Sequence, residues 1–154
     1  RSPSTTSITY NYQMNILILH GPNLNLVGKI STKLGDTITL DKINTSLRRH
    51  VRNTETTLKI YQTHKVYQAI NFIQRNRNWA NGLLFAPMSW AQYEHSICES
   101  IKISDINTIQ LLFDSGYGEI NEKNSIFTKT TIKTITGKPD KVYIEGVQSL
   151  QKLN

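Results

Sequence analysis

The side chains best suited to metal binding or nucleophilic catalysis are few and are not grouped in the sequence. They are four histidines and a single cysteine: His20, His50, His64, His95 and Cys98. No pair among them has the spacing of a zinc site, and one cysteine cannot form an internal disulfide. Cys98 lies beside the apolar face of a predicted helix and is interpreted as an unreactive thiol that packs against other side chains. We therefore expect neither a bound metal nor a cofactor.

Short apolar runs alternate with helical patterns, and these elements must position any site. Strands are predicted over 15–20, 58–62, 82–86, 108–113 and, more weakly, 132–136. Helices are predicted over 40–51, 66–73, 90–101 and 143–153, and 21–36 is interpreted as a polar loop. The alternation predicts an α/β fold, a flavodoxin-like, doubly wound, five-stranded parallel sheet with helices on both faces. Ligands then bind beyond the carboxyl ends of the strands, in the loops after His20, Gln62, Ala86 and Phe113.

The composition indicates one domain with a moderate basic excess. The chain has 154 residues, a net charge of +7 and 19% charged residues. No apolar run approaches the roughly 20 residues that span a bilayer. Basic side chains that could contact a protein partner or rRNA are Lys129, Lys133, Lys138, Lys141, Arg75 and Arg77. An ordinary solvated surface is the alternative for both groups, although Trp79 adds a ring that could stack on RNA.

The N-terminal segment differs from the rest of the chain. Residues 1–14 are rich in serine and threonine, contain no acidic residue and begin with Arg1. Such a leader is typical of the remnant of an organellar transit peptide. We expect a processed extension over 1–14 and localisation in a mitochondrion or plastid, with a plain terminal tail as the alternative.

The first predicted strand and the loop after it carry a specific motif. Residues 16–28 read Ile-Leu-Ile-Leu-His-Gly-Pro-Asn-Leu-Asn-Leu-Val-Gly. This run resembles the N-terminal signature of the type II 3-dehydroquinate dehydratases, and weaker matches continue to about residue 153. The resemblance implies a dehydroquinase-like domain over 15–154, a flavodoxin-like fold and trimers that assemble into dodecamers.

The same resemblance implies an active site that this sequence does not reproduce. The family eliminates water through an enolate, which requires a base, an activating cation and a general acid. Leu34 stands where the family has its catalytic Tyr, and Ile30 where it has an essential Arg. Ala86 replaces the substrate-binding Asn after the third strand. Gln110 and Leu112 replace the Glu and the acid His of the fourth strand.

Two asparagines are the candidates for surviving substrate contacts. Asn23 matches an active-site Asn of the family, and Asn25 follows it closely. The alternative is that the pair only shapes the loop. If the chain were active, unfamiliar residues such as Tyr93, Tyr117 or Lys29 would have to take over the catalytic roles.

The combined replacements predict a catalytically silent relative of the family. On the sequence alone we expect a non-catalytic pseudoenzyme that acts as a structural or accessory subunit of a larger organellar assembly, such as a ribosome, a respiratory complex or a photosynthetic complex. In that case the family-type trimer or dodecamer is not expected to occur free. The alternatives are an active 3-dehydroquinate dehydratase of the shikimate pathway and a regulatory module that binds a small ligand.

Overall fold

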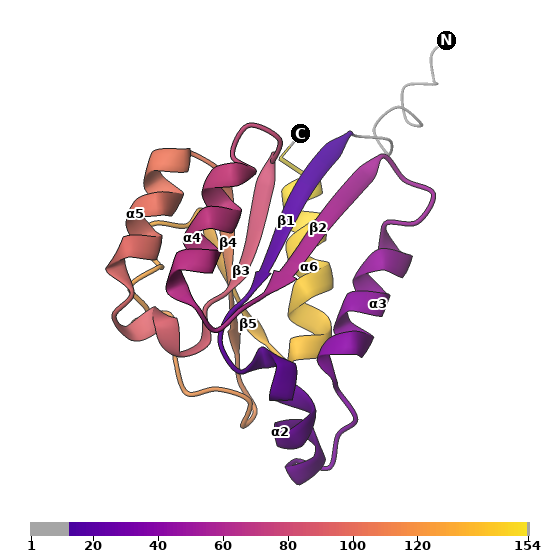
Figure 1. Ribbon diagram of the computed structural model, residues 1–154. Coiled ribbons are helices and arrows are strands. Elements are labelled where there is room, and N and C mark those ends of the chain that lie inside the picture. The colour runs from indigo at the N-terminus through magenta and orange to yellow at the C-terminus, as the bar shows by residue number, and fades with distance from the viewer. Residues whose placement is uncertain (1–12, 154) are drawn as a thin grey trace.

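Five short apolar runs form the strands of one parallel sheet in the computed structural model, which describes residues 13–153. The strands are β1 (Met14–His20), β2 (Thr56–Gln62), β3 (Gly82–Ala86), β4 (Asn107–Phe113) and β5 (Lys133–Gly137). Their order is β2-β1-β3-β4-β5, and every neighbouring pair is parallel (Figure 1). The predicted five-stranded parallel sheet is therefore confirmed.

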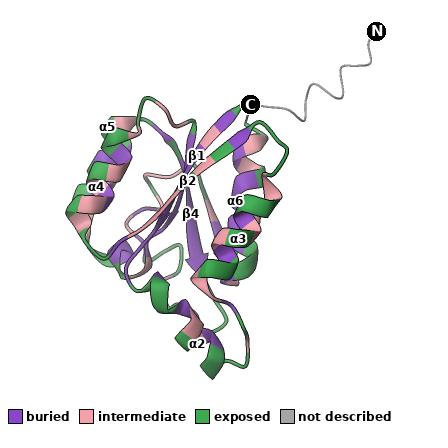
Figure 2. Ribbon diagram, turned by 45° about the vertical axis from the view of Figure 1, so that its right-hand side comes forward, coloured by how far each residue is buried: buried purple, intermediate pink, exposed green. Residues whose placement is uncertain are grey.

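Helices cover both faces of this sheet. The helices α3 (Leu40–His50) and α6 (Pro139–Gln151) lie on one face, and α4 (Val66–Arg75) and α5 (His95–Ser104) lie on the other (Figures 1 and 2). The short α2 (Val27–Lys33) lies beyond the carboxyl ends of the strands. In residues 13–153 we find no helix with the length and apolarity that a bilayer crossing requires.

Alternation along β1 divides the interior into two cores. Ile16 and Ile18 face the cluster under α3 and α6, while Leu17 and Leu19 face the cluster under α4 and α5. Successive side chains of a strand point to opposite faces. All four side chains are fully buried. The strand β1 therefore packs against both helical layers, and this packing fixes the position of the loop that follows its carboxyl end.

Two segments differ from the sequence-based expectation. The predicted polar loop 21–36 contains a 3₁₀ turn, η1 (Leu24–Leu26), followed by α2. The predicted helix over 90–101 is divided into a 3₁₀ turn, η2 (Met88–Gln92), and α5. Trp90 is buried against the second core, so its apolar spacing reflects packing rather than membership of the helix. Residues 1–12 of the expected N-terminal extension lie outside the described residues, and Met14 already belongs to β1.

Candidate active site

The loops after β1 and β3 are in direct contact at the carboxyl edge of the sheet. The backbone N–H of Gly21 donates to the carbonyl of Ala86 at 2.8 Å. A Cβ at Gly21 would lie 2.6 Å from that carbonyl oxygen and 2.7 Å from the carbonyl oxygen of Pro87. Only glycine fits this approach, which explains its place in the motif. Ala86, predicted to replace a substrate-binding Asn, is buried at this junction.

Of the two candidate asparagines, Asn23 helps to shape the loop after β1. Asn23 adopts a left-handed backbone conformation with φ 67°, which asparagine tolerates better than most residues. Its backbone N–H donates to His64 Nδ1 at 3.1 Å. Asn25 is exposed in η1. Within residues 13–153 neither side chain forms a hydrogen bond, and neither lines the pocket described next.

A pocket of about 290 Å³ lies where β4 ends beside η2. Its walls are mainly apolar, and they include Leu112, one of the predicted replacements. Ser89 and Gln92 add a hydroxyl and an amide, and Glu119 is the ionisable side chain among the residues that line it. The pocket lies where the sequence placed a ligand site, in the loops after the third and fourth strands.

Met88, which lines this pocket, has an unusual backbone conformation. Its φ is 53°, in the left-handed region that side chains other than glycine disfavour. The turn is therefore formed without glycine, the residue best suited to it, and the Met88 side chain is part of the pocket wall.

Gln110, predicted to replace a catalytic Glu, is a fully buried structural residue. Its amide nitrogen donates to Thr134 Oγ1 at 2.9 Å and to Thr128 Oγ1 at 3.2 Å. Its amide oxygen accepts a hydrogen bond from the Ser125 hydroxyl. With donors and acceptor all engaged, Gln110 ties β4 to β5 and to the segment 120–131.

Ile30 and Leu34, the other two replacements, hold α2 against the body of the domain. Ile30 packs on the core cluster under α3 and α6. Leu34 lies over Gly116, because a Cβ at Gly116 would be 2.9 Å from Leu34 Cδ2. Gly116 has φ 95° and lies in the loop after β4. The segment after β1 thus docks on the loop after β4.

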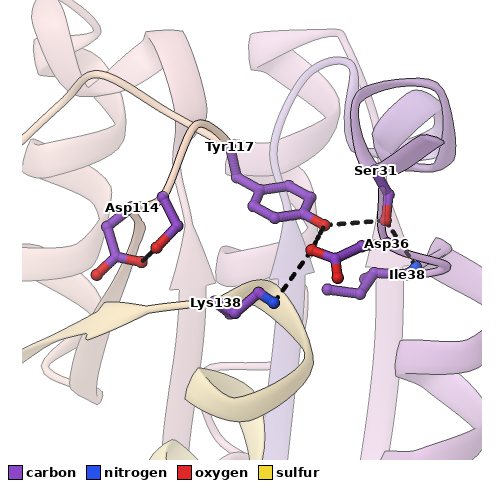
Figure 3. Close-up of polar contacts among 7 residues, drawn as sticks. Ser31, Asp36, Ile38, Asp114, Tyr117 and Lys138 are labelled. Carbon is purple, nitrogen blue, oxygen red and sulfur yellow. Dashed lines mark hydrogen bonds and ion pairs between the residues drawn. The ribbon is translucent and has the colours of Figure 1, made fainter. Parts of the chain in front are cut away.

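A chain of polar contacts joins the same two segments (Figure 3). The Tyr117 hydroxyl lies 2.9 Å from both Asp36 Oδ2 and Ser31 Oγ. Since a carboxylate only accepts, the single phenol proton goes to Asp36, and the Ser31 hydroxyl donates to Tyr117. Lys138 Nζ, just before α6, forms an ion pair with Asp36 at 3.0 Å. We call Ser31, Asp36, Tyr117 and Lys138 the latch.

The latch settles the protonation of its members near neutral pH. The hydrogen bond from Lys138 lowers the pKa of Asp36, and the bond from Tyr117 acts in the same direction. Burial raises the pKa of Tyr117, and the neighbouring Asp36 carboxylate raises it further. Tyr117 is therefore a neutral phenol that holds two loops together, not a phenolate base.

His20, at the end of β1, is buried and has partners at both ring nitrogens. Its Nδ1 lies 2.7 Å from the Tyr143 hydroxyl, and its Nε2 lies 2.9 Å from Asn44 Oδ1. The amide oxygen only accepts, so Nε2 carries the proton and Nδ1 accepts from Tyr143. Burial lowers the pKa of His20 to about 4. The ring is neutral at physiological pH and serves to connect β1, α3 and α6.

The predicted partner-contact residues fall into two separate regions. Lys129, Lys133 and Lys141 are exposed around β5 and α6, but Lys138 is engaged in the latch. Arg75 and Arg77 are exposed at the end of α4, on the other face of the sheet. The described residues include no cluster of three or more histidine, cysteine or acidic side chains placed to hold a metal ion.

Sequence reasoning missed the latch as a unit. Asp36 is the only acidic residue among the first 40, and a lone acid in a basic segment was the available signal. Its partner Tyr117 lies 81 residues away, and no local pattern connects the two. Glu119 was not among the candidate residues either, because no local pattern shows that it lines the pocket.

The parallel sheet defines a doubly wound α/β protein, and its pocket lies at the carboxyl edge, where such folds bind small molecules. The family model for class II dehydroquinases matches residues 14–151. The chain therefore belongs to the class II dehydroquinase family.

Curated relatives and solved structures agree with this assignment. A 3-dehydroquinate dehydratase of Clostridium botulinum strain 657 is 25% identical over 135 residues, which cover 87% of this chain and 92% of that protein. The enzyme of Thermoanaerobacter pseudethanolicus is 24% identical over 139 residues, covering 90% and 94%. The type II dehydroquinase structure from Butyrivibrio crossotus aligns with a TM-score of 0.79 and 22% identity over 90% of this chain and 97% of that one. The type II dehydroquinase of Propionibacterium acnes gives a TM-score of 0.74 at 19% identity, with 90% and 98% covered.

These findings correct the expected function. The prediction of a non-catalytic pseudoenzyme that serves as a structural subunit of an organellar assembly is wrong. The chain matches proteins named as 3-dehydroquinate dehydratases or type II dehydroquinases, and the matches cover nearly the whole length of those proteins. No comparison supports such a subunit. The error arose because the replaced side chains show only that the family's usual catalytic groups are missing from their usual positions. They do not exclude other groups that the fold brings to the same edge, such as Glu119.

Proposed function

We propose that the protein is a dehydratase that removes water from 3-dehydroquinate in the pocket between β4 and η2. The observation that carries the proposal is the family match over residues 14–151 together with a pocket at the carboxyl edge of the sheet. The wall residues offer the Glu119 carboxylate as a base, and the Ser89 hydroxyl and the Gln92 amide as hydrogen-bond donors to an enolate oxygen.

The proposed reaction assigns a role to each polar side chain. The Glu119 carboxylate removes a proton from the carbon next to the ketone, and the C–H electron pair moves to the carbonyl oxygen as an enolate. Ser89 or Gln92 donates a hydrogen bond to that oxygen. The enolate then re-forms the ketone, a carbon–carbon double bond forms, and the C–O bond breaks. Glu119 returns its proton to the departing hydroxide, which leaves as water and restores the carboxylate.

Charge at the pocket predicts weak substrate binding. The substrate is a carboxylate anion, and the residues that line the pocket include no lysine or arginine. Glu119 adds like-charge repulsion in the ground state. We expect a KM at or above the upper end of the usual range, about 1 mM.

The test is direct turnover of 3-dehydroquinate by the purified full chain. The product carries a carbonyl conjugated with the new double bond, so its ultraviolet absorbance reports the reaction. We expect a rate above buffer that is proportional to protein concentration and saturates at millimolar substrate. A rate equal to that of buffer over this range contradicts the proposal, and calorimetric binding without turnover would instead indicate a ligand-binding module.

A further inference from the structure

A long stretch of the chain carries positive but no negative charge. Residues 56–93 contain no aspartate or glutamate, and they include Lys59, Lys65, Arg75 and Arg77. This stretch forms β2, α4 and β3, and β2 is an edge strand of the sheet. The stretch therefore has four cations and no acidic side chain of its own, a net charge of +4.

Aromatic side chains lie among these cations. Tyr61 on β2 and Phe72 on α4 have ring centroids 5.2 Å apart. Tyr67 is 59% exposed on α4. Lys59 Nζ lies 4.2 Å from the centroid of the Trp79 ring. We call Lys59, Tyr61, Tyr67, Phe72, Arg75 and Trp79 the β2–α4 surface.

The β2–α4 surface contains a recess with rings and amides in its walls. The recess has a volume of about 330 Å³ and is lined by Tyr61, Tyr67, Gln68, Asn71, Phe72, Arg75 and Asn76. It shares no lining residue with the pocket at β4 and η2. Rings, amides and an arginine offer stacking, hydrogen bonding and phosphate binding in one place.

Arg75 on this surface and Lys65 beside it are available to a ligand, whereas Lys59 donates to Asn76 Oδ1 at 2.9 Å. Among residues 13–153 the ion pair is Lys138 with Asp36, so neither Lys65 nor Arg75 has an acidic partner there. Arg75 and Asn71 form no hydrogen bond to any described residue through their side chains. The Arg77 guanidinium contacts only the Gln74 carbonyl, at 2.6 Å. The surface is thus complementary to an anion that also carries planar rings.

We propose that the β2–α4 surface binds single-stranded nucleic acid. Bases stack on Tyr67 and enter the recess beside Tyr61, and phosphates lie against Arg75 and Lys65. Single strands are favoured over duplex because their bases are free to stack on exposed rings. The positive charge of this surface is complementary to a nucleic-acid strand. It is not complementary to the same surface of a second copy, because that contact would bring like charges together.

The proposal is tested by fluorescence anisotropy with a labelled 12-nucleotide single-stranded RNA and the full chain. Binding should weaken with salt, with a log–log slope of about −2 for roughly three neutralised phosphates. Tyr67→Ala and Arg75→Ala should each raise the Kd about tenfold. The fluorescence of Trp79, beside Lys59, should change on binding.

Matched controls separate this surface from the overall charge. Tyr93 is 61% exposed, close to the value for Tyr67, and Arg49 is exposed on α3 across the sheet. Tyr93→Ala and Arg49→Ala should change the Kd less than twofold. Equal losses in test and control variants, or equal affinity for a duplex of the same sequence, overturn the proposal. Absence of RNA binding, with a smaller particle mass for Tyr67→Ala in sedimentation, would assign the surface to a second copy instead.

Discussion

The Tyr117 hydroxyl donates a hydrogen bond to the Asp36 carboxylate at 2.9 Å, across 81 residues of sequence. This contact joins the loop after β4 to the segment after β1, and Lys138 extends it to α6. The residues that position the carboxyl edge of the sheet are therefore held by polar bonds as well as by Leu34 on Gly116.

Removing the Tyr117 hydroxyl should destabilise the domain. Tyr117 is 2% exposed, its hydrogen bond to Asp36 is partly buried, and a typical intramolecular hydrogen bond contributes about 0.5–1.5 kcal/mol. Tyr117→Phe should lower the free energy of unfolding by that amount in urea denaturation. The control Tyr93→Phe alters an exposed hydroxyl and should cost less than about 0.5 kcal/mol. Equal stabilities of the two variants would show that the latch contributes nothing.

His20 should make the domain sensitive to acid. Its pKa is about 6.5 in the unfolded chain and is lowered to about 4 in the fold. The unfolded state therefore binds a proton first, and stability is lost as the pH falls from 6.5 through 4. The loss from this residue is about 3 kcal/mol at pH 4.

Two measurements isolate the His20 contribution. Denaturation of the wild type between pH 7 and pH 4 should show a steeper loss than that of His20→Gln, whose amide does not titrate. The NMR signals of the His20 ring should stay in their neutral positions down to about pH 5. Titration of this ring near pH 6.5 would contradict the buried neutral state.

The left-handed backbone of Met88 predicts which of two substitutions at this position is the more stable. Glycine in place of alanine ordinarily destabilises by roughly 0.5–1 kcal/mol. At φ 53° an alanine keeps a left-handed cost of about 1–2 kcal/mol that glycine avoids. Met88→Gly should therefore be more stable than Met88→Ala in thermal unfolding. The reverse order would show that the turn rearranges when the side chain is removed.

The sheet was predictable from sequence, and the reason is local. Runs such as Ile16–Leu19 and Leu83–Phe85 are short, continuous apolar segments that lie close to Gly, Pro or Asn. Segments of this length and composition are typical of buried strands in a parallel sheet. The site at the ends of the third and fourth strands followed from the topology. The family resemblance was equally visible, because the loop motif contains Gly21, which the contact with Ala86 requires.

Other features were not predictable, because they depend on contacts distant in sequence. The helix α2 is too short and too polar to show helical periodicity in the sequence. Ile30 and Leu34 hold this helix in place by tertiary packing. Tyr117, a candidate catalytic residue on the sequence alone, donates its hydroxyl proton to Asp36, which is distant in sequence. The assignment of function erred because a comparison of residue types does not indicate which carboxylate lines a pocket.

The most direct test of the account compares kcat for two glutamate variants on the same loop. Glu119 lines the pocket, whereas Glu122 lies nearby and lines a different one. With 3-dehydroquinate as substrate, Glu119→Gln should lower kcat by 100-fold or more, because it removes the proton acceptor. It should also lower KM, because like-charge repulsion is removed, while Glu122→Gln stays within twofold of the wild type. A wild type without turnover, or equal kcat values for the two variants and the wild type, would contradict the account.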